Sequence, residues 1–212
     1  MIKNVFPIPI WEASYTEYNK EETVEKFYNY LDLVGTNRDN IYIPDSDTTA
    51  NDRSADTSLV TEMGTPLLFK WIVKQIRYYH DYCQYSKVAP VTDEMNSWKE
   101  QFGAVWATSG PKGGHLIHHN HNPALTAGVF YVDASPEQGN LHLLNPNDAT
   151  IGKSMFQTWD RYPHKHHEVL AETGKLVLFP GWLYHFVPKN PTDKNRLAIG
   201  FVTRNVAISV QD

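Results

Sequence analysis

The chain has 212 residues, of which 41% are hydrophobic and 13% aromatic, and it carries a net charge of −5. This length supports one substantial hydrophobic core, and the acidic balance argues against a general nucleic-acid binder, whose surface would be basic. No apolar run is long enough to cross a bilayer and no signal-peptide pattern is present, so we expect no membrane association. The single cysteine, Cys83, excludes an internal disulfide and fits a reducing compartment, which predicts a cytoplasmic protein.

The first part of the chain predicts one strand and two helices. Residues Ile2–Ile10 are apolar and β-branched but hold two prolines, which favours an edge strand or an extended arm. Apolar residues recur at helical spacing over Thr16–Val34, before a glycine that suits a helix end. The second helix is expected over Pro66–Gln84, where a wide apolar stripe would pack on a sheet and His80 would face solvent.

A long polar segment, Thr36–Ser58, separates the two predicted helices. It is rich in Asp, Asn, Ser and Thr, and we expect a surface loop with a short strand at Ile41–Ile43. Its aspartates lack the ordered spacing of an EF-hand, so a calcium loop is not expected. Loops of this length in compact domains are usually functional or disordered, and we predict that this one lies at the rim of the site and becomes ordered when substrate binds.

From Gln101 onward the pattern changes to short β-rich segments separated by Gly, Pro and Asn. These are FGAVWATS, a histidine-rich segment, ALTAGVFYVDA, GNLHLL, HHEVL, KLVLFP, YHFVP and RLAIGFVTRNVAISV. Six to eight such strands are typical of a sandwich or jelly roll. We predict an α+β, mainly β fold: a jelly roll buttressed by N-terminal helices. Residues 1–212 would form a single domain, in which 1–99 give helical and loop support and 100–212 give the jelly-roll core with its metal site.

The histidine-rich segment predicts a metal site. On an extended chain His119 and His121 point to one face, whereas His118 and Asn120 point to the other, which leaves a competing register open. A third histidine, His185, follows a buried strand much later in the chain. Imidazoles bind iron, zinc, copper and nickel well.

An arginine on the last long strand complements this predicted site. Arg196 stands eleven positions after His185, at the head of an alternating strand. An arginine offers a bidentate fork to a carboxylate. The combination suits a dicarboxylate co-substrate whose keto-acid end chelates the metal.

The same segments resemble the iron(II)/2-oxoglutarate-dependent oxygenases, and within them a bacterial and phage group. The motifs that carry this resemblance span roughly residues 100–205: His119-Asn120-His121, Ala127–Tyr131, Gly139-Asn140-Leu141 and Gly174–His185. The resemblance implies a double-stranded β-helix with iron(II) and 2-oxoglutarate as cofactors. It further implies that His119 and His185 are metal ligands and that Arg196 anchors 2-oxoglutarate.

One departure concerns His121, because the wider superfamily has a carboxylate at this position. Either His121 is a third neutral ligand, or two histidines and water hold the metal, or a carboxylate arrives from Asp133, Glu137 or Asp148. We take His119, His121 and His185 as the predicted metal site. Without an anionic ligand the metal keeps its full double charge, so iron(II) binding should weaken and anion binding should become easier.

Three functions compete at this stage. The leading hypothesis is a dioxygenase that uses iron(II) and 2-oxoglutarate to hydroxylate an unactivated C–H bond. The first alternative is a cupin-like three-histidine protein that binds zinc or nickel without 2-oxoglutarate chemistry. The second is a non-catalytic β-sandwich interaction protein with a surface aromatic cluster; its candidates are Trp159, Tyr162, Trp182 and Tyr184. Arg196 discriminates among them, since only the first requires a buried guanidinium beside the metal.

The sequence gives only general indications about partners. Trp106, Trp182 and Tyr184 stand close to the motifs, and we expect them to line the mouth of the site, which would suit a planar or peptide-like substrate. The expected substrate is a small molecule or a peptide-like group. No nucleic acid or membrane is expected, and a homodimer is allowed. A second cluster of histidines, His164, His166 and His167, is expected to be a polar loop that titrates near pH 6.5 and not a second metal patch.

Overall fold

The computed structural model describes residues 7–50, 57–85, 101–146 and 166–203. The helices are α1 (Lys20–Val34), α2 (Leu59–Glu62) and α3 (Pro66–Tyr82), with a 3₁₀ turn at Pro136–Gln138. The strands are β1 (Trp11–Ser14), β2 (Asp47–Thr48), β3 (Phe102–Gly110), β4 (Leu116–His119), β5 (Thr126–Asp133), β6 (Leu141–Leu144), β7 (His166–Val169), β8 (Lys175–Pro180), β9 (His185–Val187) and β10 (Arg196–Thr203).

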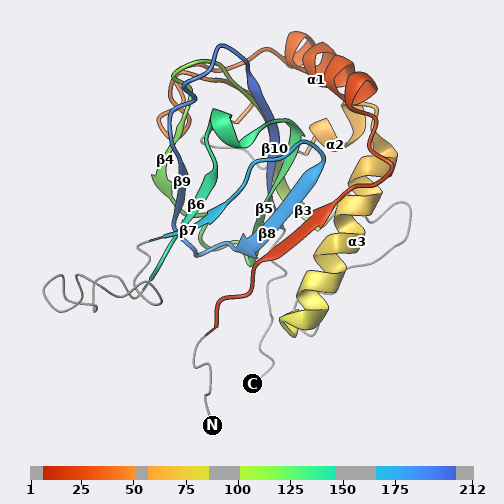
Figure 1. Ribbon diagram of the computed structural model, residues 1–212. Helices are drawn as coiled ribbons and strands as arrows, with labels where there is room; N and C mark the ends of the chain where they lie inside the picture. Colours follow the sequence, from red (N-terminus) through yellow and green to blue (C-terminus); the bar gives the residue numbers. More distant parts are fainter. Residues whose placement is uncertain (1–6, 51–56, 86–100, 147–165, 204–212) are drawn as a thin grey trace, which may run out of the picture.

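The strands form two antiparallel sheets that face each other (Figure 1). The major sheet has the order β1-β8-β5-β10-β3-β2, and the minor sheet has the order β4-β9-β6-β7. Apolar side chains from both sheets meet in one buried cluster, in which Val177 and Phe179 of the major sheet join Leu141 and Leu143 of the minor sheet. This arrangement is a jelly roll, or double-stranded β-helix, and it confirms the predicted fold class.

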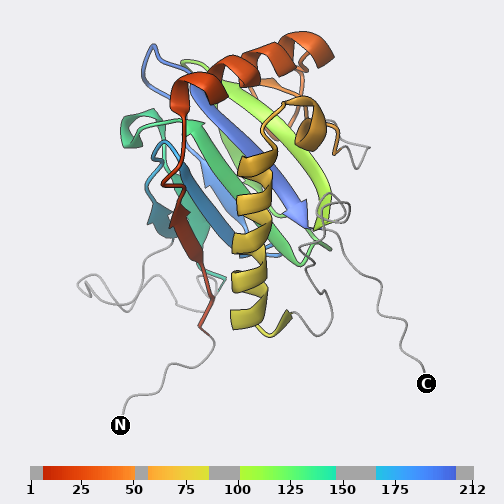
Figure 2. The same ribbon diagram turned by 90° about the vertical axis from the view of Figure 1, so that its right-hand side faces the viewer.

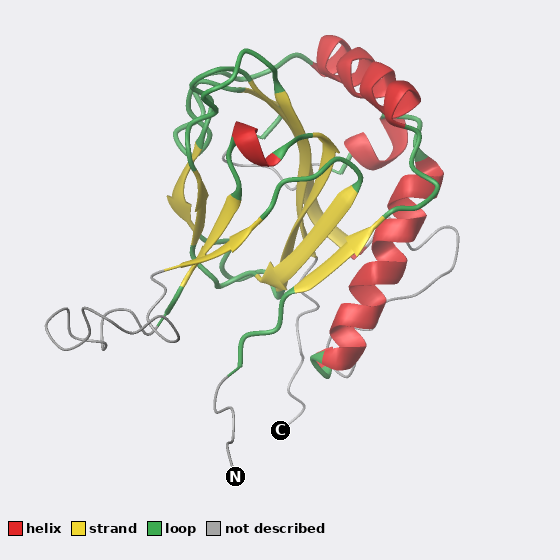
Figure 3. Ribbon diagram, viewed as in Figure 1, coloured by secondary structure: helices red, strands yellow, loops and turns green. Residues whose placement is uncertain are grey.

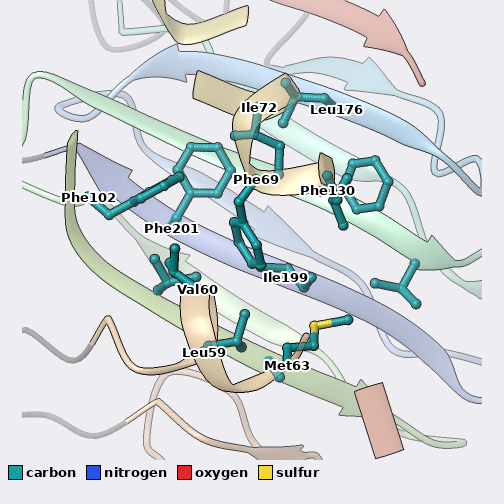
Figure 4. Close-up of a cluster of buried hydrophobic side chains, with 14 of the residues drawn as sticks. Leu59, Val60, Met63, Phe69, Ile72, Phe102, Phe130, Leu176, Ile199 and Phe201 are labelled. Atoms are coloured by element: carbon teal, nitrogen blue, oxygen red, sulfur yellow. The ribbon is translucent and has the colours of Figure 1, made fainter. Parts of the chain in front are cut away.

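The helices cover the outer face of the major sheet (Figures 2 and 3). They reach the sheet through a second buried cluster, drawn in Figure 4. It combines Leu59 and Val60 of α2, Met63 directly after α2, and Phe69 and Ile72 of α3 with Phe102, Phe130, Ile199 and Phe201 of the strands. Burial of this many large apolar side chains is the main stabilising contribution between helices and sheet, at about 1.5–3 kcal/mol for each fully buried side chain. The predicted buttressing role of the helices follows from this packing.

Both long helices end close to their predicted bounds. Asn19 caps α1 by accepting a hydrogen bond from the Glu22 N–H at 3.1 Å, and Gly35 ends it with a φ of 75° that favours glycine. In α3 the prediction that His80 faces solvent is wrong, because its ring is buried and lies 2.9 Å from the Thr126 hydroxyl. Among the helices of the described residues, none is long and apolar enough to cross a lipid bilayer.

Two short strands lie later in the chain than predicted. The N-terminal edge strand is Trp11–Ser14, whereas residues 7–10 have no regular structure and residues 1–6 lie outside the described part. The prolines explain the shift, since Pro7 and Pro9 have no N–H to donate to a ladder. The predicted strand at Ile41–Ile43 is a series of turns, and the strand of this segment is β2, which pairs with β3.

Candidate metal centre

Three of the predicted histidines converge inside the jelly roll. The ring centroids of His119 and His185 lie 4.3 Å apart, those of His119 and His121 lie 4.8 Å apart, and those of His121 and His185 lie 5.1 Å apart. One nitrogen of each ring falls within 4.8 Å of one nitrogen of each other ring. Within the described part of the chain, this is the only group of three metal-ligating side chains gathered so closely.

Strand pairing and one tight turn produce this convergence. In the minor sheet His119 of β4 stands directly opposite His185 of β9, so their side chains share a face. His121 follows β4, and its backbone N–H donates to the Gly181 carbonyl at 2.7 Å, which fixes the turn against the end of β8. A side chain at Gly181 would clash, because its Cβ would lie 2.1 Å from the Ala124 carbonyl oxygen.

Backbone hydrogen bonds orient two of the imidazoles for metal binding. The Nδ1 of His119 lies 2.9 Å from the Ile117 carbonyl oxygen, and the Nδ1 of His185 lies 3.0 Å from the Leu183 carbonyl oxygen. A carbonyl only accepts, so in each ring Nδ1 carries the proton and Nε2 keeps a free lone pair. Contacts of this kind fix the tautomer in metal-binding histidines.

Burial keeps the three rings neutral. It lowers the pKa of His121 to about 3, with a further contribution from His119. Burial and the two neighbouring histidines lower the pKa of His185 well below its usual range, and burial also lowers the pKa of His119. Neutral imidazoles are the form that binds metal.

The competing ligand candidates that the structure describes lie away from the three-histidine cluster. His118 is exposed on the other face of β4, where its ring contacts Phe186 at a centroid distance of 4.4 Å. Asp133 accepts an ion pair from Lys20 at 2.8 Å, and Glu137 is fully exposed on the 3₁₀ turn. Asp148 lies outside the described residues. The described carboxylates therefore leave His121 as the third side chain of the cluster.

Arg196 opens the strand that pairs with both β3 and β5, and its side chain is only 7% exposed. Its Nη1 donates to the Gln138 carbonyl oxygen. No described carboxylate lies within ion-pair distance of the guanidinium, and burial lowers its pKa. A buried cation without a partner is costly, so this position favours binding of an anion.

Missing side chains leave room for this guanidinium. Gly139 has a φ of 98°, and a Cβ there would lie 2.9 Å from the Nη1 of Arg196. A Cβ at Gly110 would lie 3.4 Å from Nη2. On β5 Tyr131 is also buried beside the cation; burial raises the pKa of its hydroxyl to about 12, so it remains a donor. Sequence reasoning missed Tyr131, although its alternation with Ala127 on a predicted strand could have indicated an inward position.

The histidines and Arg196 line one cavity of about 1100 Å³. The wall over the metal cluster includes Tyr42, whose ring centroid lies 5.8 Å from that of His119, and Trp106, whose ring centroid lies 5.6 Å from that of His121. Trp182 and Tyr184, also expected at the mouth, are exposed and do not line the cavity. Of the residues predicted to surround the mouth, only Trp106 does so.

The predicted rim segment does border this cavity. Its lining includes Asn40, Tyr42, Ile43, Thr49, Ala50 and Thr57, all from the polar segment between α1 and α2. The backbone of this segment is tied to the jelly roll: the Ile117 N–H donates to the Tyr42 carbonyl at 3.0 Å, and the Thr49 N–H donates to the Ala107 carbonyl at 3.0 Å. The predicted location is confirmed, and ordering by substrate stays a prediction.

Comparisons with known proteins agree with this geometry. Residues 104–202 match the family model described as "Putative 2OG-Fe(II) oxygenase". No curated protein sequence matches the chain.

Solved structures share the fold at low sequence identity. A prolyl-4-hydroxylase from Pseudomonas putida superposes with a TM-score of 0.59 at 13% identity, covering 94% of each chain. HygX from Streptomyces hygroscopicus, solved with nickel and 2-oxoglutarate bound, has a TM-score of 0.57 at 13% identity and covers 94% of this chain and 84% of its own. The epimerase SnoN from nogalamycin biosynthesis has a TM-score of 0.60 at 10% identity, with 93% and 78% covered.

A jelly roll whose cavity holds three imidazoles and a buried arginine is the arrangement that the resemblance to the 2-oxoglutarate-dependent oxygenases implies. The residues that match the family model, 104–202, run from β3 to β10, so the match covers the three histidines and Arg196 of this cavity. The cofactors of this family are iron(II) and 2-oxoglutarate, and both fit the residues present. One nitrogen of each imidazole lies within 4.8 Å of the others, and the buried Arg196 lines the same cavity.

Proposed function

We propose that this oxygenase binds iron(II) through His119, His121 and His185 and binds the distal carboxylate of 2-oxoglutarate through Arg196. One observation carries the proposal: a neutral three-imidazole cluster lines the same cavity as a buried guanidinium that has no carboxylate partner among the described residues. The imidazole nitrogens can coordinate iron(II), and the guanidinium can pair with a carboxylate of 2-oxoglutarate. The tautomers of His119 and His185 support direct coordination by Nε2.

When bound, iron(II) and 2-oxoglutarate would supply dioxygen activation, with succinate and carbon dioxide as co-products of the hydroxylation of a substrate C–H bond. The residues of the chain position these groups. Arg196 offers two parallel N–H donors to the distal carboxylate, and the protonated Tyr131 hydroxyl lies beside it as a further donor. Gly139 keeps the space that this pairing needs.

Charge balance supports the binding of a dianion at this site. Three neutral ligands leave the metal with its full double charge, and Arg196 adds one more positive charge in the same cavity. A 2-oxoglutarate dianion compensates most of this charge. A metal held by three neutral imidazoles should therefore bind weakly without 2-oxoglutarate. It should bind more tightly when the dianion is present.

We propose that the substrate is a small molecule or a peptide-like group that enters between Tyr42 and Trp106. The two rings flank the histidine cluster, so a flat or ring-bearing group between them would present a C–H bond to the metal face. The segment around Tyr42 would exclude water once this group is bound. We further propose that the helices and the jelly roll act as one domain, because a single apolar cluster includes both, and that the protein acts in the cytoplasm.

The test is 2-oxoglutarate turnover by untagged protein supplied with iron(II), measured as succinate formed. Wild type should form succinate slowly without a substrate, and His185→Ala should form none and retain no iron. The matched control is His118→Ala, because His118 is adjacent to a proposed ligand but faces away from the cavity. Metal binding without any dependence of turnover on 2-oxoglutarate would reject the proposal in favour of a cupin-like metal protein.

A further inference from the structure

A second group of metal-ligating side chains lies on the outer face of the minor sheet. Successive residues of a strand alternate between faces, so β9 carries His185 inward and Phe186 outward. Around Phe186 on the outer face lie the rings of His142 and His166, at centroid distances of 4.7 Å and 5.9 Å. In Figure 1 the minor sheet lies on the side of the molecule away from the helices.

Strand register brings two imidazoles and a carboxylate together on this face. His142 of β6 is directly opposite Glu168 of β7, and the Nε2 of His142 lies 4.0 Å from the Oε1 of Glu168. His166 precedes Glu168 by two residues on the same strand and therefore points to the same face. Its ring centroid lies 4.5 Å from that of His142, in an edge-to-face arrangement.

Neighbouring residues hold two of these side chains in place. Phe186 stacks on the His142 ring with an interplanar angle of 12°, which fixes the ring plane. The amide Nδ2 of Asn140 donates to the Oε1 of Glu168 at 2.7 Å, and the amide oxygen of Asn140 accepts from the Ala171 N–H at 2.9 Å. A carboxylate held by a hydrogen-bonded neighbour is typical of a ligand oriented by its surroundings.

The His142 ring has one buried and one available nitrogen. Its Nδ1 is buried without a hydrogen-bond partner, and its Nε2 is the nitrogen directed toward Glu168. Burial and the nearby His166 lower the pKa of His142, and Glu168 opposes this effect. A lowered pKa favours the neutral ring, and the tautomer with its proton on Nδ1 would present the Nε2 lone pair to an ion.

We propose that His142, His166 and Glu168 form a binding site for a divalent transition metal, with zinc as its best-suited ion. Two imidazole nitrogens and one carboxylate oxygen with a water as fourth ligand are a ligand set that zinc accepts. Among the described residues, only the His119 cluster has three ligand atoms within 4.8 Å of one another. At the second site, rotation of the partly exposed His166 ring would bring its nitrogen within reach of an ion held by His142 and Glu168.

An ion at this place would join β6 to β7. The two strands are separated in sequence by the 21 residues from 145 to 165. The ends of this segment are held together by the pairing of two short strands, and a bound ion would add a second link between them. Cross-links that close loops stabilise the native state by reducing the freedom of the unfolded chain. The expected role of the ion is thus to stabilise the minor sheet, on the face opposite to the catalytic cluster.

The test counts zinc in untagged, metal-stripped protein after equilibration with zinc and removal of the excess. Wild type should hold two equivalents, one at each site. His142→Ala and Glu168→Gln should each lose one equivalent and keep the other, which shows in the same measurement that the inner site and the fold survive. The matched control is His167→Ala, which removes an exposed imidazole from β7 on the other face and should keep both equivalents.

The two sites are separable in this experiment. His119→Ala should lose the zinc ion of the inner site and keep that of the outer site. If the inner site does not bind zinc, wild type should hold one ion, and His142→Ala should lose it. The inference is overturned if His142→Ala and Glu168→Gln hold as much zinc as wild type. It is also overturned if wild type holds a single ion that His119→Ala removes.

Discussion

Replacing Arg196 with methionine should separate co-substrate binding from stability. The guanidinium is 7% exposed and has the Gln138 carbonyl as its hydrogen-bond partner. Methionine retains a long apolar stem and removes the charge. If the guanidinium of Arg196 binds a carboxylate of 2-oxoglutarate, its removal should weaken 2-oxoglutarate binding. The fold of the metal-free protein should remain intact.

The magnitudes follow from the surroundings of the guanidinium. A hydrogen bond to a charged group contributes about 1.5–3 kcal/mol, so Arg196→Met should raise the dissociation constant of 2-oxoglutarate about ten- to a hundred-fold. The unliganded protein loses the bond to Gln138 but no longer buries an unpaired charge, and replacing buried charges by apolar groups is often neutral or stabilising. The free energy of unfolding should therefore change by no more than about 1 kcal/mol.

The assay is calorimetric titration of 2-oxoglutarate into protein loaded with manganese(II), in parallel with chemical unfolding of the metal-free protein. Lys112→Met is the matched control, because it removes the same charge from an exposed pair with Asp193. It should leave both measurements unchanged. An unchanged 2-oxoglutarate affinity in Arg196→Met, with a large loss of stability, would show that the arginine is structural.

Three further predictions concern the walls and the ligands of the cavity. Gly200→Ala places a Cβ 2.5 Å from the Trp106 indole, so it should displace the ring and shift its fluorescence while metal content stays at the wild-type level. In metal-free protein the contribution of neutral His121 to the free energy of unfolding should be fully present above pH 6.5. It should be lost as the pH falls toward the lowered folded pKa of His121, about 3, because the unfolded chain takes up its proton at a higher pH. Urea unfolding at several pH values should show a weaker decline in His121→Gln. Metal with 2-oxoglutarate should slow proteolysis within Thr36–Ser58, and equal cleavage rates with and without them would contradict a closing role.

The metal cluster could be predicted because local rules determine it. Alternation on a strand selected His119 with His121 over His118, and the family-like segment before His185 supplied the third imidazole. The helices were equally accessible, since α1 ends at a glycine and its apolar residues repeat at helical spacing. The helices and the HxH pair are thus indicated by neighbours in sequence, whereas His185 required the resemblance, because β9 meets β4 only in the folded sheet.

The rest of the site depends on contacts between distant segments, which one sequence does not encode locally. Tyr42 reaches the cluster because its segment pairs with β4, and nothing in its own surroundings predicts that pairing. The buried position of His80 likewise depends on Thr126, far along the chain. The second histidine cluster was expected to be a polar loop; His166 and His167 lie on β7, whereas His164 lies outside the described residues.

The two faces of the minor sheet show how one strand pair can serve two purposes. His119 and His185 occupy inward positions of β4 and β9, while the next residues in the alternation, His118 and Phe186, occupy outward positions. A change that slides β9 by one residue would exchange the faces and remove His185 from the inner cluster. The register of β9 is therefore constrained from both sides, by the buried His185 within and by the stacking of Phe186 on His142 outside. An ion bound outside would hold β6, the strand that pairs with β9, and so help to keep the inner ligands in position.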